Sequence, residues 1–378
     1  MYEVIIIGAG SVGTPIAMSL AVRGYNPLVI DSGSSAGQGN NKCAIGGVRA
    51  THSDPAKVAL SLHSLKTFAN WEEQHGEDIG WKMGGYTFVA YTKEISEALQ
   101  QMIPLQQKAG LNIRWCKPEE IVKLVPGINS KNLYGGTFSE EDGSASPMES
   151  CYAFEREAKR NGAEFAYNET VMGIEKNNEF IVTTDKGTYS AKRVINCAGS
   201  YAREVGLMVD LDLPVYPDMH EAGITEPVKR FFDPMVVDIN KALGSANYYF
   251  YQYTTGQIVF CITPNPPFLG KGTNETSTFL PQVANRMVSL YPRLANIKVR
   301  RTWRGCYPQT PDGTPILGYA GPEGYYVAVG MCGQGFMLGP GIGEVIARLV
   351  TEELTDEDKM VLDAMKLNRE FSGTESLK

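Results

Sequence analysis

The hydrophobic pattern of the chain opens with an unbroken run of β-branched residues at positions 4–7. A short run that is apolar at every position suits a strand buried on both faces of a parallel sheet. Three glycines in the G-x-G-x-x-G spacing follow it: Gly8, Gly10 and Gly13. Apolar residues then recur at helical spacing as far as Gly24, and a second apolar run at 26–30 ends at Asp31. The pattern predicts a strand, a helix and a second strand.

The residue types in this unit suit the binding of a dinucleotide. Gly8 permits a tight turn, Gly10 lets a pyrophosphate approach the backbone, and Gly13 lets the helix pack closely on the strand. The pyrophosphate would lie at the helix N-terminus, where N–H groups and the helix dipole favour negative charge. Asp31 is placed to accept hydrogen bonds from a ribose hydroxyl. The motif predicts a dinucleotide site but does not separate FAD from NAD.

The next part of the chain departs from a simple nicotinamide-binding pattern. Residues 32–54 form a long loop rich in glycine, serine and asparagine, and loops of this length are usually functional. An amphipathic helix is predicted over 55–75 and a strand over 84–92. Residues 162–199 predict several strands, and the last apolar run ends in Ala198-Gly199. This dipeptide is a second place where the backbone can approach a cofactor closely.

The second half of the chain predicts more β structure and a return to the cofactor domain. Strands are expected over 213–303, with a hairpin that turns at Thr255-Gly256 and a helix over 277–295. A buried strand at 325–330, a glycine-rich loop and a helix at 339–354 follow. Such a strand, loop and helix bring backbone N–H groups together at a ligand. We therefore expect the chain to end beside the cofactor.

Composition narrows the range of partners. The chain has 378 residues, 43% of them hydrophobic, and this length favours two domains. A net charge of −7 without long Lys/Arg blocks argues against nucleic-acid binding, and no run reaches the roughly 18 apolar residues of a membrane span. The seven cysteines have no metal-binding spacing, and their odd number without a signal peptide favours a reducing compartment. We expect a cytoplasmic protein without a metal, whose partner is a small molecule or another protein.

Five short motifs follow one another along the chain. They are G-A-G-S-V-G with Asp31, G-G-V-R at 46–49, N-C-A-G-S-Y at 196–201, W-R-G at 303–305 followed by T-P-D-G-T-P-I-L-G at 310–318, and G-M-C-G-Q-G-F at 330–336. In this order they resemble the D-amino-acid oxidase superfamily of FAD enzymes. That superfamily includes glycine oxidase, sarcosine oxidase and the β subunits of proline dehydrogenases. The resemblance covers nearly the whole chain.

The resemblance implies an α/β fold with two interleaved domains. One is a Rossmann-type FAD-binding domain like that of glutathione reductase, and the other is a substrate domain built on a mixed or antiparallel β-sheet. We assign residues 1–84, 143–212 and 313–378 to the FAD-binding domain and residues 85–142 and 213–312 to the substrate-binding domain. FAD is expected to bind without a covalent link. Cys306 lies near the cysteine that carries the flavin in some relatives, but it is displaced by one residue.

The motifs also imply a set of residues that contact the cofactor. These are Gly8, Gly10, Ser11, Val12, Gly13, Asp31, Ser32, Cys43, Ala44, Gly46, Gly47, Val171, Ala198, Gly199, Tyr201, Gly305, Gly333, Gln334, Gly335, Phe336 and Met337. In this family the flavin N5 takes a hydride from the carbon beside an amine nitrogen, and water hydrolyses the imine. Relatives often have Ser and His where this chain has Cys332 and Gln334. We expect that segment to present its backbone to the flavin.

Three residues are expected to act on the substrate: Arg49, Tyr251 and Tyr307. Relatives in the amino-acid oxidase branch commonly place a carboxylate-binding arginine just before the T-x-D-G segment, where this chain has Tyr307. Arg49 is then the candidate carboxylate clamp, and the alternative is that it contacts the cofactor or a neighbouring acid. Tyr249 and Tyr251 share one face of a strand, which would line the pocket or simply be packed. His52 lies near Arg49 and would either sit above the flavin or, as is more common for a loop histidine, be solvated.

These residues favour an FAD-dependent oxidoreductase that acts on a small amino acid or on a secondary or N-methyl amine. Tyr307 resembles the β-subunit branch, so a dehydrogenase that passes electrons to partner subunits is favoured over an oxidase. His220 is assigned no chemistry. Two alternatives are a nicotinamide-dependent reductase and a non-catalytic subunit that only holds the flavin.

Overall fold

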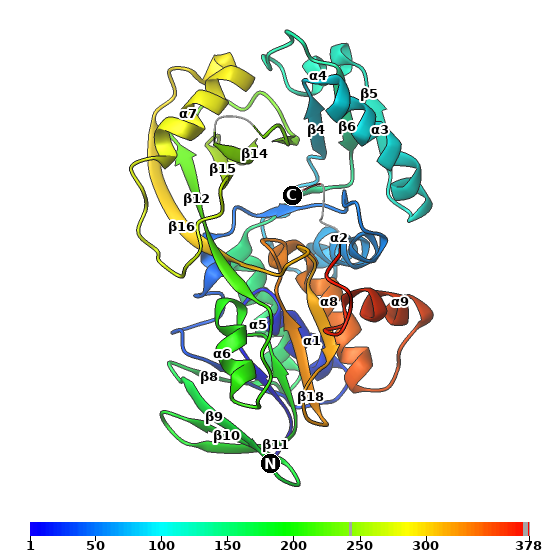
Figure 1. Ribbon diagram of the computed structural model, residues 1–378, viewed down its shortest axis with the longest axis vertical. Coiled ribbons are helices and arrows are strands. Elements are labelled where there is room, and N and C mark those ends of the chain that lie inside the picture. Colours follow the sequence, from blue (N-terminus) through cyan, green and yellow to red (C-terminus); the bar gives the residue numbers. More distant parts are fainter. Residues whose placement is uncertain (242–243, 373–376, 378) are drawn as a thin grey trace.

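The structure, a computed structural model, describes residues 1–241, 244–372 and 377, and in this part of the chain two large sheets stand one above the other (Figure 1). The strands of the first sheet are β1 (Tyr2–Ile7), β2 (Leu28–Asp31), β8 (Glu164–Tyr167), β9 (Val171–Lys176), β10 (Phe180–Thr184), β11 (Thr188–Asn196), β17 (Ile316–Tyr319) and β18 (Tyr325–Val329). Their order is β17-β18-β11-β1-β2-β8, and β9 and β10 extend from β11. Because β1 pairs in parallel with both β11 and β2, the predicted buried parallel strand is confirmed.

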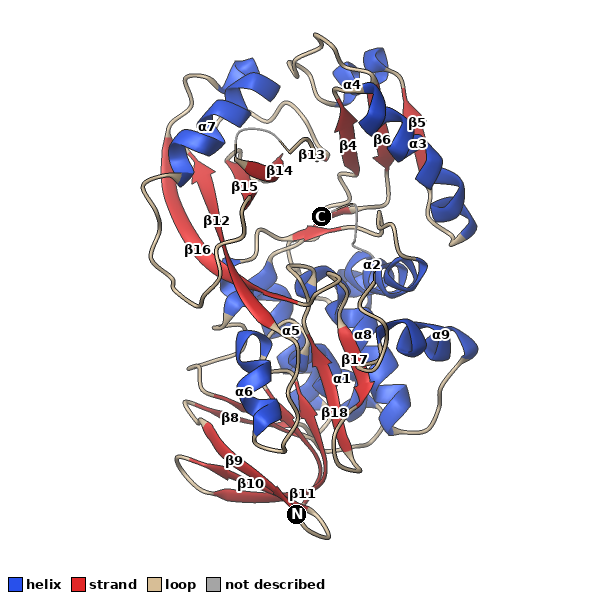
Figure 2. Ribbon diagram, viewed as in Figure 1, coloured by secondary structure: helices blue, strands red, loops and turns tan. Residues whose placement is uncertain are grey.

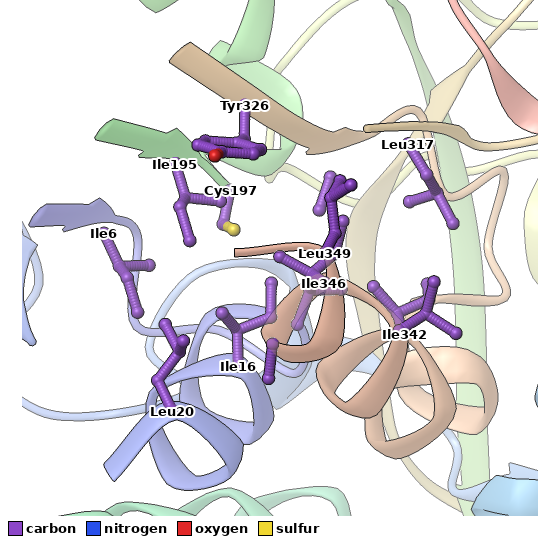
Figure 3. Close-up of a cluster of buried hydrophobic side chains, with 14 of the residues drawn as sticks. Ile6, Ile16, Leu20, Ile195, Cys197, Leu317, Tyr326, Ile342, Ile346 and Leu349 are labelled. Carbon is purple, nitrogen blue, oxygen red and sulfur yellow. The ribbon is translucent and has the colours of Figure 1, made fainter. Parts of the chain in front are cut away.

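Two helices from opposite ends of the chain pack on each other over the first sheet. They are α1 (Gly13–Val22) and α8 (Gly335–Val350), with α5 (Pro147–Arg160) beside α1. Figure 3 shows Ile16 of α1 and Ile346 of α8 meeting below Ile195 of β11. Burying one such side chain contributes about 1.5–3 kcal/mol. The C-terminal part of the chain therefore returns to the dinucleotide unit, as predicted.

The start of α8 differs from the prediction. We expected this helix over 339–354, but it begins at Gly335 and contains Pro340. The glycines that suggested a helix start are instead points of close packing. A Cβ on Gly339 would lie 2.0 Å from Ser11 O, and one on Gly341 would lie 2.2 Å from Leu60 O. Only glycine fits at these positions because α8 lies directly against its neighbours.

The second sheet is mixed and lies in the other half of the molecule. Its strands are β4 (Tyr86–Ala90), β5 (Ile113–Cys116), β6 (Gly135–Ser139), β12 (Tyr216–Thr225), β13 (Met235–Asp238), β14 (Ser245–Gln252), β15 (Ile258–Pro264) and β16 (Val299–Gln309). Their order is β16-β12-β15-β14-β13-β4-β6-β5. Figure 2 shows helices α3 (Lys93–Lys108), α4 (Pro118–Leu124) and α7 (Phe279–Leu290) in the same half of the molecule as this sheet. Helices α4 and α7 pack on one face of it, and α3 packs on the other. The predicted hairpin is the β14–β15 pair.

Alternation along β14 sends its aromatic side chains to two different cores. Tyr248 and Phe250 pack with Phe279 and Val283 of α7. Tyr251 packs with Phe88 in a separate cluster, against which Tyr249 also packs. Successive residues of a strand point to opposite faces, so one face of the sheet is covered by α7 and the other faces the first domain. This second face forms one wall of the site.

The remaining elements lie outside the two large sheets. They are α2 (Pro55–His75), which matches the predicted helix, the short sheet of β3 (Gly47–Val48) and β7 (Gly143–Ser144), α6 (Ala202–Leu207), α9 (Asp356–Met365) and the 3₁₀ turns Asn40–Cys43, Gly199–Tyr201 and Pro292–Leu294. In the part of the chain that the structure describes, no helix combines the length and the apolar character needed to cross a bilayer. All seven cysteines lie within the described residues and are free thiols.

Candidate active site

The glycine loop between β1 and α1 has the close contacts that its motif requires. A Cβ on Gly13 would lie 1.8 Å from Gly8 O, and one on Gly8 would lie 2.5 Å from Cys197 O. Gly8 has a φ of 108°, which side chains other than hydrogen rarely tolerate. A Cβ on Gly10, in contrast, would meet nothing within 4 Å. At Gly8 and Gly13 close packing therefore leaves no room for a side chain, whereas Gly10 borders open space.

Asp31 lies directly over this loop. One carboxylate oxygen accepts a hydrogen bond from Ala9 N at 2.6 Å, and the other accepts one from Gly33 N at 2.6 Å. The segment after β11 also reaches the loop, since Cys197 N donates to Ile7 O. Gly199 has a φ of 57° and, like Gly10, would meet nothing within 4 Å of an added Cβ. Two backbone segments thus meet beside the N-terminus of α1.

These residues fit a dinucleotide. Open space at Gly10 and Gly199 lets backbone approach a ligand, and the N-terminus of α1 carries no acidic residue in its first turn. Helix N-termini of this kind stabilise phosphate through N–H groups and the helix dipole. The carboxylate of Asp31 at the end of β2 would favour a ribose with a free hydroxyl over one with a 2′-phosphate.

A cavity lies between the segment 332–337 and the inner face of the second sheet. Among its lining residues are Arg49, His220, Tyr249, Tyr307, Gln334 and Leu377. Tyr307 packs against the glycine segment so closely that a Cβ on Gly333 would lie 2.3 Å from its ring. The cavity is therefore formed where the two halves of the molecule meet.

Arg49 lies after β3 and is 6% exposed. Its Nη1 donates to Thr51 O, and its Nη2 donates to Leu377 O at 2.5 Å. The guanidinium also lies 5.3 Å from the centre of the Phe88 ring. A neighbouring acid, Asp142, accepts hydrogen bonds from Ala50 N and Thr51 Oγ1, and burial raises the pKa of this carboxyl to about 6. Arg49 thus presents a cation to the cavity with an acid nearby.

Two tyrosine hydroxyls meet in the wall of the cavity. Tyr249 Oη and Tyr307 Oη are 2.7 Å apart, and burial raises the pKa of both phenols. They therefore stay protonated at neutral pH, and because one hydroxyl donates to the other, the pair leaves one O–H to donate elsewhere. Tyr251, which we expected in the site, does not line this cavity, and its hydroxyl donates to Ile45 O at 2.6 Å.

The two histidines near the site differ from the sequence-based expectation. His52 is fully buried, not solvated, and its Nδ1 lies 3.3 Å from Arg49 Nη1. His220, to which no chemistry was assigned, lines the cavity and stacks on the Tyr307 ring at 3.8 Å between centroids. Its Nε2 lies 2.9 Å from Asp218 Oδ2. His220 reaches the cavity because β12, which carries it, pairs with β16, the strand of Tyr307, and no local pattern in the sequence indicates this pairing.

Other residues predicted to bind the cofactor lie at different distances from this cavity. Met337 lines the cavity. Phe336 instead packs in a hydrophobic core, where its ring centroid lies 5.2 Å from that of Phe68. Val171, the first residue of β9, packs in a hydrophobic core of the first sheet, and Tyr201 is 60% exposed. Cys43 lies beside Gly305, since a Cβ on that glycine would be 2.6 Å from the Cβ of Cys43.

The other predicted contacts border the same region. Ser11 lies against α8, and Gly46 has a φ of 89° beside Ala145. Gly47 packs under the Tyr86 hydroxyl. Burial raises the pKa of the Cys306 thiol, and its Sγ contacts Gly270 O at 3.6 Å. This thiol therefore stays protonated and is a poor nucleophile.

Comparisons with known proteins agree with this geometry. The family model described as "FAD dependent oxidoreductase" (DAO) matches residues 3–349. Glycine oxidase of Bacillus subtilis (strain 168) is 26% identical, with 97% of this chain and 97% of that protein covered. Mitochondrial sarcosine dehydrogenase of Mus musculus is 25% identical across 98% of this chain, which spans only 42% of that protein. The crystal structure of L-proline dehydrogenase from P. horikoshii has a TM-score of 0.91 and 30% identity, with 97% of each chain covered.

These matches do not favour a nicotinamide-dependent reductase or a non-catalytic subunit. They support the family of FAD-dependent enzymes that act on amino acids or N-methyl amines. The loop around Gly10 and the carboxylate of Asp31 fit that cofactor. Because the family model spans most of its length, the chain belongs to the DAO family of FAD-dependent oxidoreductases, with FAD as its cofactor.

Proposed function

We propose that this chain dehydrogenates a small amino acid, or a secondary or N-methyl amine such as proline or sarcosine, by hydride transfer. The observation that carries the proposal is the cavity that Arg49, Tyr249 and Tyr307 line together beside the segment 332–337. The guanidinium donates hydrogen bonds, and the tyrosine pair, in which one hydroxyl donates to the other, has one O–H left to donate. Donors of this kind suit a carboxylate, which small amino acids carry beside the amine.

The bound FAD supplies the hydride acceptor, and the residues of this chain position the substrate. Arg49 binds the carboxylate, because a guanidinium pairs with it through two parallel hydrogen bonds. The carbonyl of Leu377, 2.5 Å from Nη2, already lies where an acceptor oxygen binds this guanidinium. A substrate carboxylate would take that position. The tyrosine pair supplies one further donor, the O–H that is not used between the two hydroxyls.

Positioning is the main contribution that the protein makes in this proposal. Groups held in a fixed reactive geometry can lower a barrier by about 7–11 kcal/mol. The lining residues are well held: Tyr307 is fixed by the hydroxyl of Tyr249 and by stacking on His220. Arg49 is fixed by Thr51 and by the Phe88 ring.

The domain division and the mode of flavin binding belong to the same proposal. Residues 1–84, 143–212 and 313–378 would hold FAD, and residues 85–142 and 213–312 would form the wall over the substrate. The strands of the two sheets fall on either side of these limits. FAD would bind without a covalent link, since the thiol of Cys306 has a raised pKa. A cytoplasmic location is proposed on the free state of all seven cysteines.

We favour a dehydrogenase that passes electrons to a partner protein over an oxidase. Tyr307, in place of the arginine common in the oxidase branch, supports this choice. So does the similarity to sarcosine dehydrogenase and to L-proline dehydrogenase. After anaerobic reduction by substrate, admitting air should restore the flavin colour only slowly. Rapid recolouring with formation of hydrogen peroxide would overturn the dehydrogenase assignment.

The function itself is tested by screening substrates against the flavin-loaded protein without oxygen. Glycine, N-methylglycine and both enantiomers of proline are added in turn, and the visible absorption of oxidised flavin is followed. We expect at least one to reduce the flavin. The control is the matched hydroxy acid, which has no amine and should leave the flavin oxidised. If none of the amines reduces it, the proposed substrate class is wrong.

A further inference from the structure

Gln334 carries a buried acceptor that the described part of the protein leaves unpaired. Its side chain is 4% exposed, lines the cavity, and its Oε1 has no hydrogen-bond partner among the described residues. Its backbone is fully used, because N donates to Met331 O at 2.8 Å and O accepts from Leu338 N at 3.0 Å. A buried polar atom without a partner is destabilising, and such atoms are uncommon in folded proteins. The carboxamide is therefore suited to a ligand that brings a donor.

The other polar groups of the cavity do not supply that donor. Arg49 donates to two backbone carbonyls, and the hydroxyls of Tyr249 and Tyr307 bond to each other. These groups suit the carboxylate of an amino acid. An acceptor at Gln334 suits the other polar group of the same molecule, its amine. Carboxylate and amine are thus matched by donors and an acceptor that line one cavity.

The protonation state needed for reaction decides which amines carry a donor. A carbon beside nitrogen gives up hydride readily only when the nitrogen is neutral and has a lone pair. In that form a primary amine has two N–H bonds, a secondary amine has one, and a tertiary amine has none. Only the first two can donate to Gln334 Oε1 while they react.

We propose that Gln334 Oε1 accepts the N–H of the substrate amine and so restricts this enzyme to primary and secondary amines. Gln334 is then a residue that determines specificity, and tertiary amines are rejected because they leave this oxygen unpaired. The inference rests on the proposed function, which by itself does not distinguish secondary from tertiary amines.

A pair of non-reacting ligands tests the proposal by binding alone. Pyrrole-2-carboxylate and 2-furoate have the same shape and carboxylate, but the first has a ring N–H where the second has an oxygen. Both are titrated into the flavin-loaded protein, and dissociation constants are measured by calorimetry. We expect pyrrole-2-carboxylate to bind more tightly by about 5- to 150-fold, the range given by an unpaired buried acceptor. Equal affinities would overturn the proposal, including the case in which Gln334 faces the cofactor instead.

Two variants locate the effect at this residue. Gln334→Leu removes the acceptor at similar volume, so the ratio of the two affinities should fall to about one. Gln334→Glu keeps acceptor oxygens and should preserve a preference for pyrrole-2-carboxylate. A Gln334→Leu protein that keeps the full ratio would overturn the proposal. If that variant does not fold, the ligand pair on the unaltered protein and the Gln334→Glu variant still decide.

Turnover with isomeric substrates separates this inference from the function on which it rests. N-ethylglycine and N,N-dimethylglycine have the same atoms, but only the first has an N–H when neutral. We expect N-ethylglycine to reduce the flavin with the higher kcat/KM. Equal values would refute the role of Gln334 and leave the proposed function standing. Failure of every amine would refute the proposed function, while the ligand pair would still test Gln334.

Discussion

Gly10 and Gly13 lie in one loop, but their surroundings predict opposite effects of the same substitution. A Cβ on Gly13 would lie 1.8 Å from Gly8 O, far inside van der Waals contact. Gly13→Ala must therefore push α1 away from the loop, and overpacking of this kind costs about 1–3 kcal/mol. A Cβ on Gly10 would meet nothing within 4 Å. Gly10→Ala should leave the flavin-free protein unchanged or stabilise it by about 0.5 kcal/mol, because the unfolded chain loses freedom.

Gly10→Ala should nevertheless lower the affinity for FAD. The methyl group of Gly10→Ala would occupy the open space through which pyrophosphate approaches the backbone. A steric cost of about 1–3 kcal/mol corresponds to a loss of FAD affinity of roughly 5- to 150-fold. Gly10→Ala should thus weaken FAD binding without a loss of stability, whereas Gly13→Ala should lower the stability of the flavin-free protein.

Two measurements on the flavin-free proteins check this contrast. Thermal unfolding gives the stability of each variant, and quenching of flavin fluorescence gives the affinity for FAD. Gly187→Ala is a suitable control, since nothing lies within 4 Å of a Cβ added there and the residue is remote from the loop. Gly24→Ala is not suitable, because Gly24 has a φ of 84°. If Gly10→Ala destabilises the protein as much as Gly13→Ala, or binds FAD normally, the assignment of the open space to the cofactor is refuted.

Three further changes test the substrate wall. Arg49→Ala should lower kcat/KM for amino acids by about 30-fold or more, since removing one partner of a buried charge pair costs about 2–5 kcal/mol. The kcat/KM for amines without a carboxylate should fall much less. Equal losses for the two kinds of substrate would argue against Arg49 as the carboxylate clamp. Tyr307→Phe removes one hydroxyl of the pair with Tyr249 and should raise KM for carboxylate substrates, whereas an unchanged KM would exclude that hydroxyl from binding. Burial raises the pKa of Asp142 from 3.8 to about 6, so the stability that its protonated form contributes is present below pH 3.8 and is lost as pH rises through 6. The unfolding free energy of the protein, relative to that of Asp142→Asn, should fall by roughly 3 kcal/mol across that interval. A difference that does not change with pH would contradict the raised pKa.

The dinucleotide unit could be predicted from the sequence because its determinants are local. The run at 4–7, the three glycines and Asp31 lie within one strand–helix–strand segment, and each has a backbone or packing reason for its residue type. The return of the C-terminal part to this unit was also predictable from the strand and glycine loop at 325–335. The start of α8 could not be predicted, because the glycines at 339 and 341 are required by close contacts with Ser11 and Leu60, which are distant in the sequence.

The substrate wall was harder to predict because strand pairing and side-chain contacts far apart in the sequence form it. Tyr249 and Tyr251 share one face of β14, yet only Tyr249 lines the cavity, because the Tyr251 hydroxyl bonds to Ile45 O. His220 reaches the site because β12 pairs with β16, which carries Tyr307. The contact of Leu377 with Arg49 joins residues 328 positions apart. No local pattern in the sequence indicates such a contact.

The central claim is that this chain removes a hydride from the carbon beside an amine nitrogen. It is tested most directly by a single anaerobic turnover with a substrate deuterated at every carbon bonded to the amine nitrogen, with flavin absorbance followed and the product identified. We predict that one equivalent of substrate reduces one equivalent of flavin, more slowly than the undeuterated substrate does, and yields an imine or its hydrolysis product with one deuterium lost. A flavin that stays oxidised with every small amino acid and amine, or a product that retains all the deuterium on these carbons, would contradict the account.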